Sequence, residues 1–221
     1  MKKALYLLLY ITTALIGVSC KSDDPEPAST PGVLESFISN NVSIKVSQVK
    51  DYYVSRYQSD YITHRGYYIV PSKDIKISAL GCKVPEKGSY EIILCSGVPF
   101  DFVSGNYIYS DQINITNENE FQFKKVDQEI ILLANQKYLL VYNTKNPLFY
   151  YEAKYVTDNW ASNADHILLP HTIHDVQVTE SFYMYASYRN DGNHYFDTGG
   201  TSTWGAFTLS GLVDLKYEVV E

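Results

Sequence analysis

The sequence predicts an all-β protein, built as a single antiparallel β-sandwich of about ten strands. From about residue 41 to the end, short runs alternate apolar and polar residues with a period of two, and short polar turns separate them. No amphipathic helix of convincing length interrupts these runs, although residues 33–41 could hold one short helical turn. Strands with one apolar face pair into two sheets that bury those faces against each other, and a closed barrel is the main alternative.

The first twenty residues have the three parts of an export signal. Two lysines start it, residues 4–16 are apolar apart from two threonines, and Gly17-Val18-Ser19 places small residues before Cys20. The apolar run is short for a bilayer span, which takes about 20 residues. The stretch resembles a bacterial lipoprotein signal, although that family usually carries Leu where this chain has Gly17. The resemblance implies that residues 1–19 are removed and that Cys20 is acylated, for example with palmitate. An ordinary cleaved signal and an uncleaved anchor are the alternatives.

The segment after Cys20 is acidic and rich in proline. Its run Lys21-Ser22-Asp23-Asp24-Pro25-Glu26 resembles the export tag that sends lipoproteins of bacteroidete-type Gram-negative bacteria to the outer face of the outer membrane. Prolines among small polar residues cannot pack a core and favour extended chain. We therefore expect residues 20–33 to be the lipidated cysteine and a flexible tether of up to about 40 Å. One sandwich domain is expected over residues 34–221.

The acidic composition excludes one class of partner. The net charge is −7, and removing residues 1–19 takes away two lysines and no acid, which makes the charge of the mature chain −9. Such a chain lacks the basic surface that nucleic-acid binding needs, and anionic lipid surfaces would repel it. The 21 tyrosines, against 9 Phe and 2 Trp, suit strands and also suit an exported binding surface.

The predicted strands follow one another closely along the chain. In the first, Val42, Ile44 and Val46 alternate with polar residues, as in a half-buried strand. In the last, Val213, Leu215, Tyr217 and Val219 share the apolar face, and the other face carries Asp214, Lys216 and Glu218. The runs between them are "DIKISALGCKV", "YEIILCSG", "NYIYSDQINI", "EFQFKKV", "EIILL", "KYLLVYN", "LFYYEAKYV" and "DVQVTESFYMYASY".

Cys82 and Cys95 lie on either side of a turn rich in Pro and Gly. A two-residue turn at Gly88-Ser89 would place the two cysteines opposite each other in a hairpin, where a disulfide could form. A longer loop that starts at Pro85 would move them out of register. Proline is poor in a paired strand, so the longer loop and two buried free thiols are favoured.

A family resemblance covers roughly residues 66–143. The runs "GYYIVPSKDIKISALGCKV", "YEIILCSG" and "VDQEIILLANQKYLLVYN" resemble, in pattern and order, the bacterial β-sandwich family called domain of unknown function 4082. The resemblance implies a sandwich in an extracellular setting. It carries no catalytic motif and no functional residue to this chain.

Two clusters have the residue types of metal sites. His166, His171 and His174 lie near Asp165 and Asp175, but a three-residue spacing brings two histidines together on a helix and separates them on a strand. The other cluster is a turn that lacks the alternating acids and final glutamate of a calcium loop, and a hairpin turn at Asp191-Gly192 explains it. We expect surface histidines and no metal. The members of the second cluster are Asn190, Asp191, Asn193 and Asp197.

No motif for catalysis or for a cofactor is present in the sequence. It has no serine in a glycine elbow, no phosphate loop and no dinucleotide fingerprint. Cys82 and Cys95 both lie in strand-like runs, which is not an obviously reactive setting. We therefore expect no enzyme and no cofactor, although a pair of hydrolytic carboxylates would meet only in the fold.

Aromatic residues give the best candidate for a binding site. In "ESFYMYASYR", Phe182, Met184, Ala186 and Tyr188 form the apolar register, whereas Tyr183 and Tyr185 share the other with Ser181, Ser187 and Arg189. Tyrosines on a polar face could form a platform for sugar rings. The predicted contact residues are Tyr183, Tyr185, Trp204, Trp160 and Arg189. The alternative is that these aromatic side chains only pack.

Three classes of function remain open at this point. The leading class is a non-catalytic binding module on the cell surface, for glycan or another surface polymer. The second is a structural or adhesive protein that contacts protein partners through the edges of its sheets. The third is a hydrolase whose carboxylates the sequence does not reveal.

Overall fold

The computed structural model describes residues 31–51, 61–96, 107–145, 147–155, 168–188, 194–200 and 208–220, with the backbone alone at residues 61, 185–188 and 194–200. The unit Pro31–Glu221 is compact. Its described residues form one helix and fourteen strands in antiparallel sheets, which confirms the all-β sandwich and exceeds the ten strands expected.

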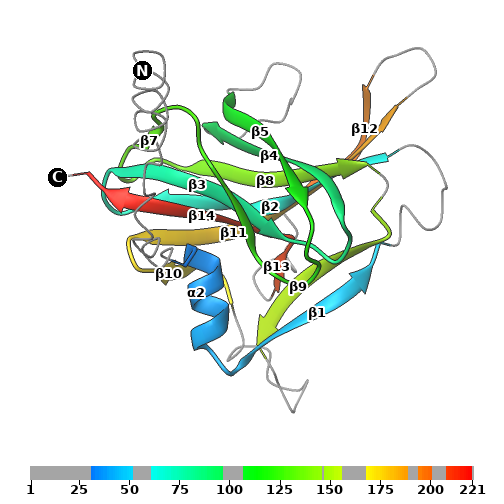
Figure 1. Ribbon diagram of the computed structural model, residues 1–221, viewed down its shortest axis with the longest axis horizontal. Coiled ribbons are helices and arrows are strands. Elements are labelled where there is room, and N and C mark those ends of the chain that lie inside the picture. Colours follow the sequence, from blue (N-terminus) through cyan, green and yellow to red (C-terminus); the bar gives the residue numbers. More distant parts are fainter. Residues whose placement is uncertain are drawn as a thin grey trace, which may run out of the picture. The chain divides into compact units, whose positions relative to one another are not determined.

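The strands of the described residues form three sheets (Figure 1). The largest has the order β10-β11-β2-β8-β4-β5, with β12 also pairing with β11; the second has the order β14-β3-β6, with β7 also pairing with β3; the third has the order β1-β9-β13. The strands of the seven-stranded sheet are β10 (His171–Ile173), β11 (Val176–Tyr188), β2 (Tyr61–Pro71), β8 (Tyr138–Lys145), β4 (Gly88–Ser96), β5 (Tyr107–Ile115) and β12 (His194–Gly200). Those of the four-stranded sheet are β14 (Leu212–Val219), β3 (Ile75–Lys83), β6 (Gln122–Lys125) and β7 (Ile131–Leu132). Those of the three-stranded sheet are β1 (Ile44–Lys50), β9 (Phe149–Tyr155) and β13 (Thr208–Ser210).

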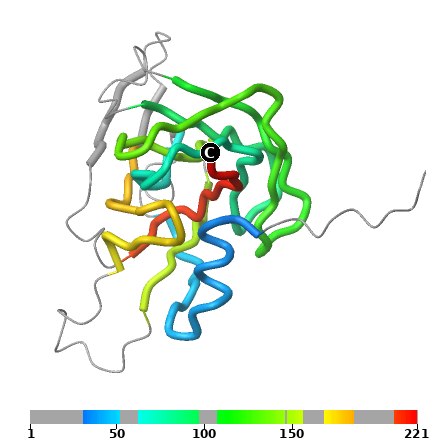
Figure 2. The backbone as a smooth tube through the Cα atoms, turned by 90° about the vertical axis from the view of Figure 1, so that its left-hand side faces the viewer, coloured from blue at the N-terminus to red at the C-terminus, as the bar shows by residue number. Residues whose placement is uncertain are grey.

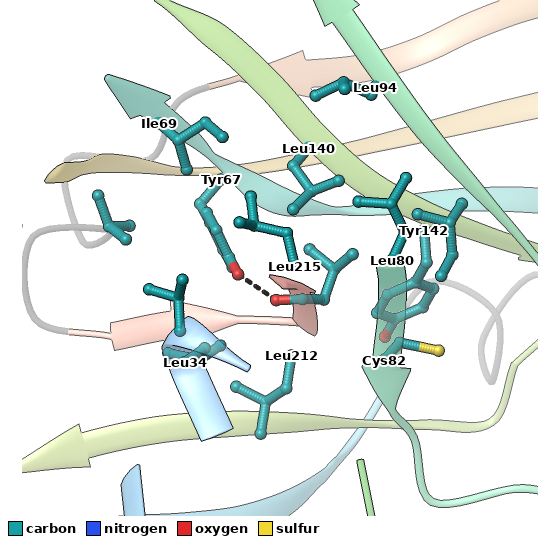
Figure 3. Close-up of a cluster of buried hydrophobic side chains, with 14 of the residues drawn as sticks. Leu34, Tyr67, Ile69, Leu80, Cys82, Leu94, Leu140, Tyr142, Leu212 and Leu215 are labelled. Atoms are coloured by element: carbon teal, nitrogen blue, oxygen red, sulfur yellow. Dashed lines mark hydrogen bonds between the residues drawn. The ribbon is translucent and has the colours of Figure 1, made fainter. Parts of the chain in front are cut away.

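The main core fills the space between the seven-stranded and four-stranded sheets (Figure 3). Ile69 and Leu140 come from the first sheet, and Leu80 and Leu215 come from the second; each is at most 2% exposed. The Tyr67 hydroxyl crosses this core and donates a hydrogen bond to the Val213 carbonyl. The sandwich interior is therefore apolar, with a tyrosine hydroxyl tying one sheet to the other.

The central strands of the seven-stranded sheet are buried on both faces. In β8, Leu139 and Val141 alternate with Leu140 and Tyr142, and all four are at most 2% exposed. The first two belong to a second apolar cluster, which lies on the face away from the main core. The prediction of one solvent-facing side is therefore wrong for β8. Its continuous apolar run is typical of a strand covered on both sides. The second cluster contains Tyr68, Ile93, Cys95, Leu139, Val141, Phe182 and Met184.

The chain passes from one sheet to the other between Cys82 and Cys95. Strand β3 pairs with β14, β6 and β7, whereas β4 pairs with β5 and β8. The two strands therefore form no hairpin, and the disulfide hypothesis is wrong. Both cysteines are buried free thiols, as the longer loop favoured. Burial raises the pKa of Cys82 to about 12 and that of Cys95 to about 11, so both thiols stay protonated.

The first strand begins later than the alternation predicts. Val42 is 97% exposed and precedes β1, which starts at Ile44. The Asn41 side-chain oxygen accepts the Ser43 N–H at 3.1 Å, and the Asn41 carbonyl accepts the Ile44 N–H at 3.0 Å. This turn, held by the asparagine side chain, competes with strand pairing and carries Val42 into solvent.

The helix α2 (Val33–Asn40) is longer than the single turn expected from the sequence. Gly32 and Val33, which the sequence analysis assigned to the tether, are buried together with Leu34. Figure 2 shows the helix in blue beside the C-terminal strand β14 in red. The prediction that Asp214 faces solvent is wrong, because the N-terminus of this helix covers it, and Leu212 to Leu215 are all buried.

Candidate functional site

The predicted aromatic site is described only in part. Tyr183 is described with its side chain and Tyr185 by its backbone. Trp160, Arg189 and Trp204 lie outside the described residues, as does the predicted lipidation site Cys20. Among the predicted contact residues, Tyr183 is therefore the one whose side chain the structure describes.

Tyr183 lies at the centre of β11, between two strands. It pairs with Arg65 of β2 on one side and with Gly200 of β12 on the other. Residues directly opposite each other in a sheet share a face, so the half-buried Tyr183 side chain lies on the same face as Arg65. On that face Ser181 is 3% exposed, and its hydroxyl donates a hydrogen bond to the Thr208 carbonyl at 2.7 Å. The polar register of β11 is therefore covered at Ser181, and the prediction of a wet face there is wrong.

A register shift between Val178 and Glu180 in β11 explains this difference. Before the shift, Val178 packs into the main core; after it, Phe182 and Met184 join the second cluster on the other face. Residues 178, 182 and 184 have the same parity, so the sequence places them on one face. One extra residue at the bulge moves the later ones to the other side. Phe182 and Met184 are buried as predicted, but not in the main core.

A buried polar group that we call the Arg65 cluster lies next to Tyr183. It consists of Asp51, Arg65, Tyr150 and Ser210. The Arg65 Nη2 atom is 2.7 Å from Asp51 Oδ2, and Nη1 donates to Ser210 Oγ at 3.0 Å. The guanidinium carbon lies 3.5 Å from the centroid of the Tyr150 ring. Arg65 is 3% exposed and Asp51 is fully buried, so the cluster is an ion pair inside the protein.

The strands of two sheets bring the cluster together. Asp51 follows β1, and its N–H donates to the Leu148 carbonyl at 2.8 Å, which holds the end of β1 beside the start of β9. Ser210 ends β13, and Gly211 follows with φ 82°. A Cβ on Gly211 would lie 2.5 Å from the Arg65 Cβ, so this turn needs glycine for both its conformation and its space. The cluster therefore fastens the three-stranded sheet to β2.

The chemistry of the cluster suits a structural role better than a catalytic role. The Arg65 donors contact Asp51 and Ser210, so a carboxylate already balances the guanidinium charge. Burial raises the pKa of the nearby Tyr142 hydroxyl well above its ordinary value, and the Arg65 charge offsets only part of this rise. The half-buried Tyr150 ring lies against the Arg65 guanidinium, and the half-buried Tyr183 is paired with Arg65 across the sheet.

The two described histidines of the metal-like cluster have different surroundings. His171 is in β10, with its ring centroid 4.4 Å from that of Phe37 in α2, and burial lowers its pKa. His174 is in the turn after β10 with φ 55°. Within the described ranges, no three His, Cys, Asp or Glu side chains are grouped so that they could hold a metal ion. His166, the turn residues 190–193 and the side chain of Asp197 lie outside the described part.

The Arg65 cluster was not predicted from the sequence. One signal was present, because Arg65 interrupts the run "YITHRGYYIV", and a charged residue in a buried strand needs a partner. Nothing near Asp51 in the sequence identified it as that partner. The two residues meet only through the pairing of β1 with β9 and through the contact of β13 with β2.

No protein-family model matches the chain, and no curated protein matches it. The resemblance to domain of unknown function 4082 thus stays a prediction. In the described part of the chain, no helix combines the length and the apolar character that crossing a bilayer requires.

Proposed function

We propose that this protein is a lipoprotein anchored in the outer membrane through Cys20 and facing the cell exterior, and that its sandwich is a non-catalytic binding module for glycan. The observation that carries the proposal is the order of the first residues, in which an apolar run and three small residues precede Cys20. An acidic, proline-containing segment follows, and the compact unit begins at Pro31. That order suits a domain displayed on a short tether.

The anchor is tested by metabolic labelling with a palmitate analogue. Wild-type protein is expected to take up the label and Cys20→Ala to take up none, because only the cysteine at the cleavage site is acylated. Cys82→Ala is the control, since Cys82 is fully buried in the core and its loss leaves Cys20 intact. Equal labelling of wild type and Cys20→Ala would refute the anchor.

The ligand class rests on the aromatic rings at the Arg65 cluster. Sugars present apolar C–H faces that lie against aromatic rings, and their hydroxyl groups bond to nearby polar atoms. Tyr183 and Tyr150 are half-buried, which suits rings that share their area between the protein and a ligand. Strand addition is less favoured at the edge strand β5, where Lys124 Nζ and Gln128 Nε2 already donate to the Gln112 and Ile108 carbonyls.

The ligand class is tested on a glycan array with soluble protein that starts at residue 21. We expect a hit, and we expect Tyr183→Ala to weaken it by about thirtyfold, the usual cost of about 2 kcal/mol for losing a central aromatic. Tyr183→Phe keeps the ring and should stay within a few-fold of wild type. Tyr107→Ala is the matched control, because Tyr107 is 45% exposed on β5. Unchanged affinity in Tyr183→Ala would exclude this residue, and an array without hits would exclude glycan while leaving the anchor untouched.

A further inference from the structure

Asp214 of β14 caps the helix α2 from the far end of the chain. The Leu34 N–H donates to its Oδ1 at 2.9 Å and the Glu35 N–H donates to its Oδ2 at 2.8 Å, across sequence separations of 180 and 179 residues. The first N–H groups of a helix lack partners within the helix, and an N-cap side chain usually accepts from them. Here the N-cap residue is Gly32, which has no side chain. The Asp214 carboxyl therefore accepts the hydrogen bonds that an N-cap side chain would accept.

The surroundings of Gly32 leave no room for a side chain at this position. A Cβ on Gly32 would lie 2.1 Å from Asp214 Oδ2 and 2.5 Å from Phe123 Cζ. The Glu35 side chain in turn accepts the Gly32 N–H at 3.0 Å. Asp214 is fully buried beneath the helix N-terminus and Phe123.

Among the residues that the structure describes, no salt bridge pairs the Asp214 carboxyl with a cationic side chain. Burial raises the pKa of Asp214 to about 7, against the opposing effect of the Leu34, Glu35 and Leu215 N–H groups, and the Glu35 carboxylate raises it further. From β2, Tyr67 approaches Asp214, and burial and that carboxyl raise the pKa of its hydroxyl. Opposite Asp214 in β3 is Gly81, and β6 contributes the uncharged Phe123.

Two lysines also lie in the strands around Asp214. On β14 itself, Lys216 Nζ lies 4.3 Å from the centroid of the Phe123 ring. In β3, Lys83 lies within the electrostatic reach of Glu35, and burial lowers its pKa. The shift in the Asp214 pKa comes mainly from burial.

We propose that Asp214 and the N-terminus of α2 form a pH-responsive latch, which holds the first helix against β14 at acidic pH and opens more readily as the pH rises to neutral. Opening exposes Asp214 to water, where its pKa returns to about the ordinary value of 3.8. Between that pH and about 7 the closed latch therefore holds a proton that the open latch releases. The opening equilibrium rises about tenfold for each pH unit in this window and levels off above it, about a thousandfold in total.

One consequence of opening rests on the proposed lipid anchor, although the latch itself does not. The eight residues of α2 directly follow the tether. As a helix they span about 12 Å, and as extended chain they reach about 26 Å. Release of the helix would thus let the domain stand farther from the membrane.

Hydrogen exchange of the full-length protein in detergent tests the latch. The measured quantity is the protection of the amides in peptides that cover α2, after division by the intrinsic exchange rate at each pH. The protection of the Leu34 and Glu35 amides is expected to fall about tenfold per pH unit from pH 5 to 7 and to stay level above pH 7. The amides of Leu139 to Val141 in the centre of β8 are the internal reference and should stay more protected than those of α2 at every pH, because they exchange only when the domain opens beyond the latch.

Two variants separate the latch from general loss of stability. Asp214→Asn removes this titrating group and should abolish the fall in the protection of α2 with rising pH. The remaining contribution comes from His171, whose ring contacts Phe37 of α2 and whose pKa burial lowers, and it has the opposite sign. Glu35→Gln keeps an oxygen that can accept the Gly32 N–H but removes the neighbouring charge, so protection should level off at a lower pH. If Asp214→Asn does not fold, Glu35→Gln decides, and an unchanged profile in it would overturn the proposal. Protection of α2 in the wild type that is constant or rises with pH would overturn it as well, as would protection of α2 equal to that of β8, because α2 would then open only when the whole domain unfolds.

Discussion

The variant Asp51→Ala is expected to lower the free energy of unfolding by about 3–5 kcal/mol, because it leaves the Arg65 guanidinium buried without its carboxylate partner. Arg65 is 3% exposed, so water cannot replace the lost ion pair at 2.7 Å. Urea denaturation at pH 7 measures the loss as a shift in the midpoint. Glu129→Ala is the matched control. It breaks an ion pair of 3.1 Å whose Lys76 and Glu129 side chains are 48% and 66% exposed, and it should cost less than about 1 kcal/mol.

A second variant tests whether the cost comes from the unpaired charge. Asp51→Ala combined with Arg65→Met removes both charges and keeps much of the apolar volume of the arginine. It should be more stable than Asp51→Ala alone, because no uncompensated charge is left inside the protein. If the double variant is less stable than the single one by the full cost of a second large truncation, the ion pair is not the main contribution of these residues.

The variant Gly66→Ala is expected to cost at least about 3 kcal/mol or to prevent folding, because a new methyl group would meet backbone atoms of a central strand. A Cβ on Gly66 would lie 2.1 Å from the Leu140 carbonyl oxygen and 2.8 Å from the Val141 Cα. Neither atom can move without disturbing β8, which is buried on both faces. The yield of soluble protein and the urea midpoint measure the effect.

Gly88→Ala serves as the comparison for Gly66→Ala. At Gly88 the nearest atom to a new Cβ is Tyr90 Cε2 at 3.9 Å, so there is space for a methyl group. Its φ of 151° is unfavourable for alanine, which should cost about 1 kcal/mol. A loss in Gly66→Ala no larger than that in Gly88→Ala would show that β8 yields to the methyl group.

The class of fold could be predicted from the sequence because some strands carry a local alternation of apolar and polar residues that their burial follows. In β5, for example, Tyr109, Ile113 and Ile115 are buried while Ser110 and Asn114 between them are exposed. Such a pattern is complete within nine residues and does not depend on which strand lies next to it. The central position of β8 in its sheet could also be predicted locally, because its unbroken apolar run is typical of a strand that is covered on both faces.

The connections and the polar sites could not be predicted in this way. The pattern on either side of Pro85 fits a hairpin and a crossing between sheets equally well. Only the pairing of β3 with β14 and of β4 with β8 distinguishes the two. No glycine or proline marks the bulge in β11. The equal parity of Val178 and Phe182 therefore predicted, wrongly, that both side chains lie on one face. Asp214 occupies a position that alternation assigns to solvent, and only a helix 180 residues away makes it buried.

The long separation between Asp214 and α2 also limits when the helix can be capped during synthesis. The N-terminal helix emerges first from the ribosome or the export channel, yet its first turn lacks an acceptor until the last strand arrives. An isolated helix of eight residues is far too short to persist in water. The first turn of α2 can therefore gain its Asp214 acceptor only once β14 is in place, and a chain that stops before β14 would leave this helix without its cap.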